Sequence, residues 1–155
     1  MTTWKLPPKA KIYEALSAIA DGRVEIVTPG MARVTSSSRD KIYDVTWSGD
    51  HEISSNDNAS FWQGYVGYPI VAVLLVTGRL QVDLNVASQL AGVPWKKLNT
   101  KFKRNYDAVV EHVLREIDEK GGDSQAIISA ADRIFAELST LTLTAGESRR
   151  PPSPR

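Results

Sequence analysis

Residues 68–78 read Tyr-Pro-Ile-Val-Ala-Val-Leu-Leu-Val-Thr-Gly, and residues 69–76 are the longest apolar run in the chain. This run is far shorter than the roughly 20 apolar residues that a membrane-spanning helix needs. Its valines would suit a buried strand, and periodicity cannot separate strand from helix over so few residues. Pro69 at the first helical position and Gly78 just past the end favour a helix. We therefore predict a buried helix in the core.

An N-terminal helix is expected well before this run. Apolar residues recur at helical spacing from residue 12 to residue 20, and Asp21-Gly22 provides a C-terminal stop. Lys9, Lys11 and Glu14 fall on the other face of this helix, which we expect to be exposed.

Residues 23–54 are rich in β-branched and aromatic residues, with turn sequences at residues 28–30, 36–40 and 48–50. This pattern predicts a small antiparallel sheet of three or four strands. The following segment is turn-rich but carries three aromatic residues that we expect to be mostly buried, namely Phe61, Trp62 and Tyr65.

The C-terminal half, residues 68–141, is predicted to be mainly helical. Asp83 can cap a short helix, and apolar residues spaced by three and four from Trp95 to Ile117 predict one long helix. Asp123 or Ser124 can cap a last helix. The fold class is therefore α+β, with an N-terminal helix, a small antiparallel sheet and a helical C-terminal half.

Composition is that of one globular domain, which we place at residues 1–143, followed by a disordered tail at residues 144–155. The chain has 155 residues, of which 42% are hydrophobic and 24% charged. It has no cysteine, which excludes disulfides, thiolate zinc sites and cysteine nucleophiles. The N-terminus lacks the apolar region of a signal peptide, so we expect a cytoplasmic protein and no membrane partner.

Basic residues are concentrated in one segment, although the net charge of +1 excludes nucleic-acid binding through bulk charge. Residues 95–104 carry five cations and no acid, whereas residues 42–78 carry acids and no Lys or Arg. A cationic helix face can neutralise several phosphates, although a solvated helix face explains the same pattern. The candidate nucleic-acid-binding residues are Lys96, Lys97, Asn99, Thr100, Lys103 and Arg104.

Residues 85–103 resemble a helix-turn-helix motif, with Ser88 as the small residue, Gly92 in the turn, and Val93 and Leu98 at apolar positions. The resemblance implies a second helix that presents its residues to a DNA groove, here Trp95, Lys96, Asn99, Thr100 and Lys103. Lys101 departs from the motif because its position is usually apolar.

Residues 33–75 resemble the SWIM-type zinc-binding domain. The matching segments are Val34-Thr-Ser-Ser-Ser38, Tyr43-Asp-Val45, Asn56-Asp57 and Ile70-Val-Ala-Val-Leu74. The four zinc-ligand positions fall at Ile53, Ser55, Gly67 and Pro69, none of which is a usable ligand. The resemblance implies a β-hairpin packed on a helix, with Ile53, Phe61, Trp62 and Tyr65 replacing the metal, and a DNA- or protein-binding role.

Two further groups of polar residues are also candidate sites. The polar loop Asn56, Asp57 and Asn58 could bind a ligand, although Asx turns explain these residues equally well. Asp50, His51, Glu52 and Asp57 could form a metal site or an acid–base pair, although these residue types are also common in turns. No phosphate-binding glycine loop or serine nucleophile motif is present, so we expect no enzyme, no cofactor and no metal.

The sequence predicts a non-enzymatic binding module that contacts nucleic acid, DNA or RNA, through residues 95–104. The alternative is a protein-interaction or structural module, for which a homodimer through the C-terminal helices is one arrangement.

Overall fold

The computed structural model describes residues 3–145 and contains one antiparallel sheet whose four strands pair in chain order. The strands are β1 (Val24–Thr28), β2 (Met31–Thr35), β3 (Ile42–Ser48) and β4 (Glu52–Ser55). The predicted α+β class and the small antiparallel sheet are confirmed. Gly30 in the β1–β2 turn has a φ of 99° and its O accepts a hydrogen bond from Trp47 N, which ties the turn to β3.

Helices make up most of the remaining secondary structure of the described residues. They are α1 (Ala10–Ala20), the π-helix η1 (Ala59–Gln63), α2 (Tyr68–Val76), α3 (Leu84–Ser88), α4 (Trp95–Lys101), α5 (Tyr106–Glu119) and α6 (Ser124–Thr140). The predicted end signals are confirmed: Pro69 lies in the first turn of α2, and Asp83 and Asp123 cap α3 and α6 with their carboxylates.

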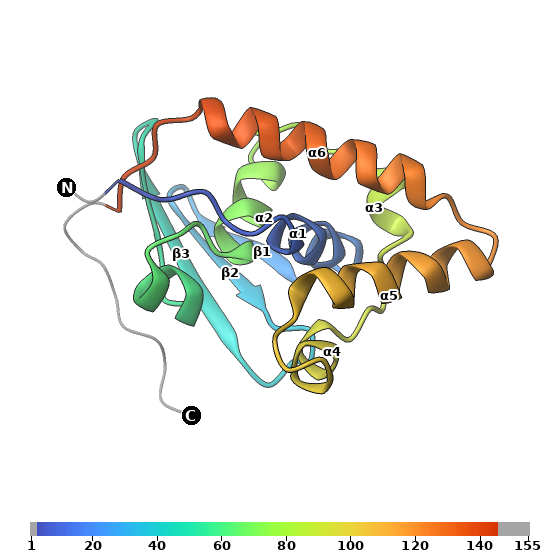
Figure 1. Ribbon diagram of the computed structural model, residues 1–155. Coiled ribbons are helices and arrows are strands. Elements are labelled where there is room, and N and C mark those ends of the chain that lie inside the picture. Colours follow the sequence, from blue (N-terminus) through green and yellow to red (C-terminus); the bar gives the residue numbers. More distant parts are fainter. Residues whose placement is uncertain (1–2, 146–155) are drawn as a thin grey trace.

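The helices α1 and α2 form a middle layer (Figure 1). On one side α2 contacts the sheet, and on the other side α1 contacts α5 and α6. The apolar run of α2 is buried from Pro69 to Leu75, as its sequence predicted. Burial of these seven residues removes their apolar side chains from water, which stabilises the domain.

The long helix predicted from Trp95 to Ile117 is wrong, because the chain breaks between α4 and α5. Lys103 and Arg104 have φ values of 53° and 64°, which lie in the left-handed region. Asn105 then caps α5 by accepting a hydrogen bond from Ala108 N. Apolar spacing continues across the break because both helices pack on the same core, so periodicity alone could not reveal it.

Two predictions are wrong about which side chains are buried: Lys11 and Glu14 were expected to be exposed, and Trp62 was expected to be buried. Lys11 and Glu14 on α1 are 8% and 5% exposed, because α1 is covered by several helices and the two side chains form an ion pair. Trp62 is 69% exposed, so it does not replace a metal in the core. It instead packs edge-on against Phe61 within the short π-helix.

The segment before residue 146 is packed and does not belong to a disordered tail. Thr144 pairs with Thr3 and with Glu52, and Ala145 is buried. The rest of the predicted tail, residues 146–155, lies outside the described residues. Among residues 3–145, no helix is both long and apolar enough to cross a membrane.

Candidate ligand-binding pocket

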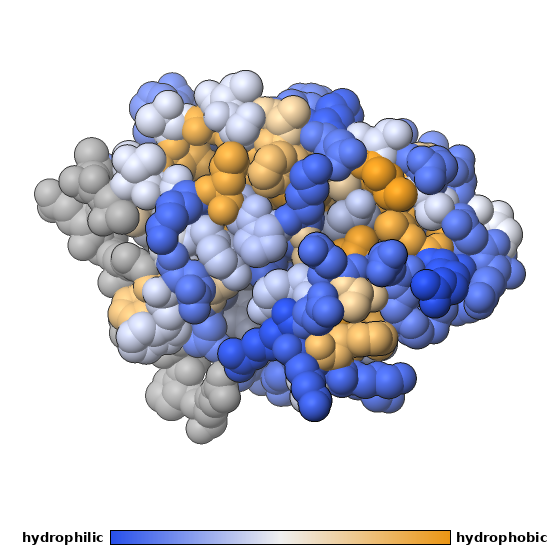
Figure 2. Space-filling view, in the orientation of Figure 1, coloured by the Kyte–Doolittle hydropathy of each residue, from blue (hydrophilic) through white to orange (hydrophobic). Residues whose placement is uncertain are grey.

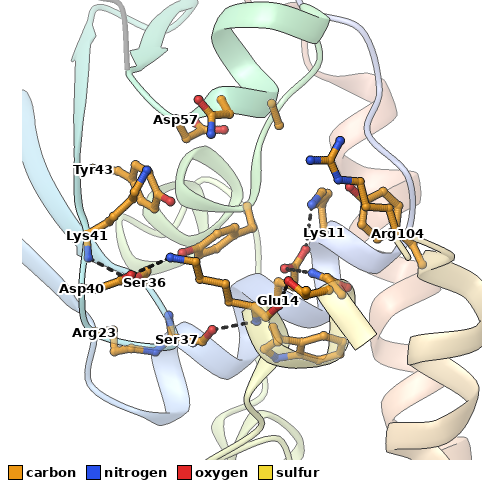
Figure 3. Close-up of a pocket in the computed structure, with 18 of the residues that line it drawn as sticks. Lys11, Glu14, Arg23, Ser36, Ser37, Asp40, Lys41, Tyr43, Asp57 and Arg104 are labelled. Atoms are coloured by element: carbon orange, nitrogen blue, oxygen red, sulfur yellow. Dashed lines mark hydrogen bonds and ion pairs between the residues drawn. The ribbon is translucent and has the colours of Figure 1, made fainter. Parts of the chain in front are cut away.

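A pocket of about 1140 Å³ lies where the sheet, α1, α2, α4 and the start of α5 meet. This volume is slightly above the usual range for small-molecule sites, roughly 300–1,000 Å³. Figure 3 shows Tyr43, Lys41 and Asp40 on one side of the pocket and Lys11, Glu14 and Arg104 on the other. The pocket is therefore built from segments that are far apart in the sequence.

Positive charge predominates around this pocket. Six of its lining residues are basic and three are acidic: Lys11, Arg23, Lys41, Lys96, Lys103 and Arg104 against Glu14, Asp40 and Asp57. Three of the basic side chains, Lys41, Lys103 and Arg104, form no ion pair with any residue in the range 3–145. Strongly hydrophilic side chains gather around the position of α4 in Figure 2. The rim of the pocket can therefore attract an anion.

A buried polar network forms one wall. Lys11 Nζ lies 3.0 Å from Glu14 Oε2 and 4.5 Å from the centre of the Tyr106 ring. Asn99 Nδ2 on α4 donates to Glu14 Oε1 at 3.2 Å. Burial acts to lower the pKa of Lys11, but its interactions with Glu14, Tyr106 and Tyr65 together outweigh burial, and the pKa is raised above its ordinary value. Lys11 therefore remains a cation inside the pocket.

Lys96 joins α4 to the β2–β3 loop. Its backbone N–H donates to Ser37 Oγ at 3.0 Å, and its Nζ lies 2.6 Å from Asp40 Oδ2. The Lys96 ammonium, helped by the hydroxyls of Ser38 and Ser36, holds the pKa of Asp40 well below its usual range. All these residues except Ser38 line the pocket, so Lys96 closes this side of it.

The break between α4 and α5 places two cations at the pocket. A non-glycine residue in the left-handed region costs roughly 1–2 kcal/mol, and here Lys103 and Arg104 adopt it in succession. Arg104 N donates to Asn99 O at 2.8 Å, which closes the turn. Such local strain is typical of functional sites. In Figure 3, Arg104 lies beside Lys11 at the pocket.

Aromatic rings supply the apolar part of the lining, which includes Tyr43, Tyr68, Trp95 and Tyr106. Tyr43 and Tyr68 pack edge-on, with ring centroids 6.2 Å apart. Burial raises the pKa of both phenols, so they are neutral at physiological pH. The lining thus combines flat ring surfaces with cations.

Two buried N–H groups of the lining have no acceptor among residues 3–145. Arg23 donates from Nε to Asp21 Oδ2 at 3.2 Å and from Nη1 to Thr35 O at 2.8 Å, which leaves Nη2 without a partner. The indole Nε1 of Trp95 is the second such donor. Buried polar groups in folded proteins are nearly always hydrogen-bonded, so these two indicate a place for an acceptor.

The pocket includes most of the predicted nucleic-acid-binding residues. Lys96, Asn99, Thr100, Lys103 and Arg104 line it, whereas the exposed Lys97 does not. Sequence reasoning missed Lys11, Glu14, Arg23 and Lys41, because only the tertiary fold brings them to α4. The acid at i+3 from Lys11 was a local sign of an ion pair.

The predicted polar loop has two kinds of residue: some hold the backbone in place through hydrogen bonds, and some line the pocket. Asn56 Oδ1 accepts a hydrogen bond from Asp44 N, and the buried Asp57 accepts from the backbone and hydroxyl of Ser60. Asp57 and the exposed Asn58 also line the pocket. The local hydrogen bonding that the alternative interpretation expected is therefore made by Asp57, whereas Asn56 bonds to the backbone of β3 twelve residues away.

Trp95 and the four positions that correspond to zinc ligands are all buried. Trp95 is 2% exposed, so it does not lie on an open helix face as the helix-turn-helix resemblance implied. Ile53 and Ser55 on β4 are buried, as are Gly67 and Pro69 at the start of α2. His51 contacts Thr142 O, and no group of three or more His, Asp or Glu within residues 3–145 is arranged to hold a metal ion.

A protein-family model described as "Uncharacterised conserved protein UCP014422" matches residues 4–144. The chain belongs to this family. The match to UCP014422 covers the sheet, all the helices and every residue that lines the pocket. No curated protein and no solved structure matches the chain significantly.

Proposed function

We propose that this UCP014422 protein is a non-enzymatic module that binds single-stranded nucleic acid in the pocket between the sheet and α4. The observation that carries the proposal is the meeting of cations from separate segments around a pocket lined by aromatic rings. Single-stranded nucleic acid offers phosphates to such cations and flat bases to such rings.

The phosphates would lie at the rim. Lys41, Lys103 and Arg104 have no acidic partner among the described residues, and Lys103 and Arg104 are exposed. They can therefore neutralise phosphates without first breaking an ion pair. Each such contact releases counterions, so binding would weaken as salt concentration rises.

The bases would enter the pocket. Tyr43, Tyr68 and Tyr106 are half-buried, so each holds a ring that is fixed by packing yet still contacts the cavity. Stacking of a base on an aromatic side chain is typically worth about 1–3 kcal/mol and requires a base that is not paired in a duplex. This requirement favours a single strand over a double helix.

The shape of the site favours the same ligand. Lys11 and Arg23 lie within the walls and are 8% and 3% exposed, so the rigid outer surface of a duplex would not reach them. The exposed outer face of α4, which carries Lys97, is the surface that the sequence assigned to nucleic acid. Comparing Lys97 with the lining cations therefore separates pocket binding from binding along the helix.

The test is fluorescence anisotropy with labelled single-stranded and duplex oligonucleotides of the same sequence, over a range of salt concentrations. We expect tighter binding of the single strand and a linear fall of log affinity with log salt. Lys103→Ala and Arg104→Ala should each weaken binding about threefold to tenfold and flatten the salt slope by roughly one.

Lys97→Ala and Lys120→Ala are matched controls, because both remove one exposed charge that does not line the pocket. Both should bind within about twofold of the unaltered protein. Equal losses of affinity in Lys97→Ala and Arg104→Ala would show that the nucleic acid binds along the outer face of α4 and not in the pocket. Absence of binding to any single strand at low salt would refute the proposal.

A further inference from the structure

We infer that the inner wall of the pocket, at Arg23 and Trp95, binds a terminal phosphate group, so that the protein selects phosphorylated ends of single strands. This inference rests on the proposed function and adds the part of the ligand that the interior recognises. It is carried by the two buried donors of the lining, Arg23 Nη2 and Trp95 Nε1, that no described residue accepts.

Arg23 is held in place by the fold. Its side chain is 1% exposed, and its Nε and Nη1 atoms are fixed by Asp21 and by the carbonyl of Thr35. The remaining Nη2 cannot turn away to water without breaking both bonds. A guanidinium fixed in this way is a preorganised donor, and arginine is the side chain most often used to recognise phosphate.

Trp95 adds a second donor from another element. It begins α4 and is 2% exposed, and its indole N–H can only donate. Two N–H groups without acceptors call for a ligand rich in acceptor oxygens. A phosphate monoester meets this need because it has three free oxygens and a charge of about −1.5 to −2 near pH 7.

A terminal phosphate fits this place better than a phosphodiester within a strand. A phosphodiester is flanked by nucleotides on both sides, so both parts of the strand would have to pass through the pocket interior. A terminal phosphate is attached to the strand on one side only, so a single passage to the wall is enough. The guanidinium and indole lie deeper than the exposed cations Lys103 and Arg104. The end of a strand can therefore reach the wall while its following phosphates stay at the rim.

Entry would take place beside Lys96. Its ion pair with Asp40 closes that side of the pocket, and the two side chains are 48% and 54% exposed. Exposed pairs of this kind are weak and are readily opened by water and salt. The side chain of Lys96 can then swing to the incoming phosphate, which replaces the carboxylate of Asp40 as its partner.

The test compares oligonucleotides of one sequence, about ten nucleotides long, that end in a 5′-phosphate, a 3′-phosphate or hydroxyls only, with the label on the other end. A phosphate at one of the two ends should tighten binding about tenfold, the effect of a charged hydrogen bond. A hydroxyl-ended strand lengthened by two nucleotides serves as the charge control and should gain less than threefold.

Two variants test the assignment to the inner wall. Trp95→Phe keeps a ring and removes the N–H, and it should reduce the tenfold advantage of the phosphorylated end to below about threefold. Arg23→Lys keeps the charge and removes Nη2, and it should do the same; its thermal unfolding is measured in parallel. Lys120→Ala should retain the full advantage.

The outcomes separate this inference from the proposed function. Tight, salt-sensitive binding that does not distinguish phosphate from hydroxyl ends would overturn the inference and leave the proposed function intact. An equal gain from the lengthened strand, or a full phosphate advantage in Trp95→Phe, would also overturn it. If no single strand binds at all, both the proposed function and the inference that rests on it are refuted.

Discussion

The Nζ atom of Lys11 lies 3.0 Å from the Oε2 atom of Glu14, and the two side chains are 10% and 7% exposed. The pair occupies adjacent turns of α1, on the side of the helix that faces the pocket. Burying each charge costs desolvation free energy, which the attraction between the two charges offsets. Removing one member of the pair should therefore destabilise the fold more than removing both.

Lys11→Met should therefore destabilise the fold strongly, by about 3–5 kcal/mol, because it leaves Glu14 buried without a counter-charge. The measurement is the free energy of unfolding in urea near pH 7. The double variant Lys11→Met with Glu14→Leu should lose less stability than Lys11→Met alone. A single variant within about 1 kcal/mol of the unaltered protein would contradict the buried pairing.

Gly67→Ala should destabilise the protein by about 1–3 kcal/mol, the usual cost of overpacking. A Cβ at residue 67 would lie 2.3 Å from Asp57 Oδ2 and 2.8 Å from Ser60 Oγ. Thermal or urea unfolding measures the loss. Adding Asp57→Ser to Gly67→Ala should recover part of the lost stability, because the shorter side chain leaves space for the new Cβ. A double variant that is no more stable than Gly67→Ala alone would show that the clash with Asp57 does not cause the loss.

Lys103→Gly should raise the free energy of unfolding by up to about 1 kcal/mol, since glycine adopts a positive φ without a steric penalty. It should also weaken oligonucleotide binding about as much as Lys103→Ala, which gains no stability. Urea unfolding and anisotropy on the same samples provide the two values. A glycine variant that is less stable than Lys103→Ala would argue against strain at this turn.

Asp40 should keep its charge to unusually low pH. Because its folded pKa is lowered, mainly by Lys96, its contribution to stability is present above its unfolded pKa of roughly 4 and is lost as pH falls toward the folded value. Carbon-detected NMR titration of the carboxyl group measures this pKa directly.

Lys96→Met is the matched variant for this titration. It removes the ammonium and leaves the hydroxyls of Ser36 and Ser38, so it should raise the Asp40 pKa toward its ordinary value without restoring it fully. An Asp40 pKa that is the same in Lys96→Met would mean that Lys96 does not tether α4 to the β2–β3 loop in solution.

The sequence was most informative where local chemistry decides structure. Pro69 and Gly78 bounded α2, and Asp83 and Asp123 capped their helices through short-range hydrogen bonds. It misled at Lys103 and Arg104, where a periodic apolar stripe continues across a turn. It also misled at Trp62, whose size predicts burial but whose place on η1 leaves it exposed.

The candidate site was predicted in part. The basic segment at residues 95–104 supplies Lys96, Lys103 and Arg104 to the pocket. Its partners could not be found in the same way, because Lys11 and Arg23 lie more than seventy residues earlier in the chain. Expecting Lys11 to be exposed was reasonable from its charge, since a buried ammonium requires a partner that only the folded helix supplies.

By itself, the sequence determined the α+β class, the order of the N-terminal helix, the sheet and the helical C-terminal half, and the buried apolar run, because caps, turns and periodicity act over a few residues. Only the tertiary structure decided that α1, the β2–β3 loop and α4 meet around one cavity. Long-range packing made that choice, and it turned a basic helical segment into one wall of a pocket with a buried arginine. Side chains brought together from distant segments carry no short-range signature, so their joint chemistry becomes visible only in the folded chain.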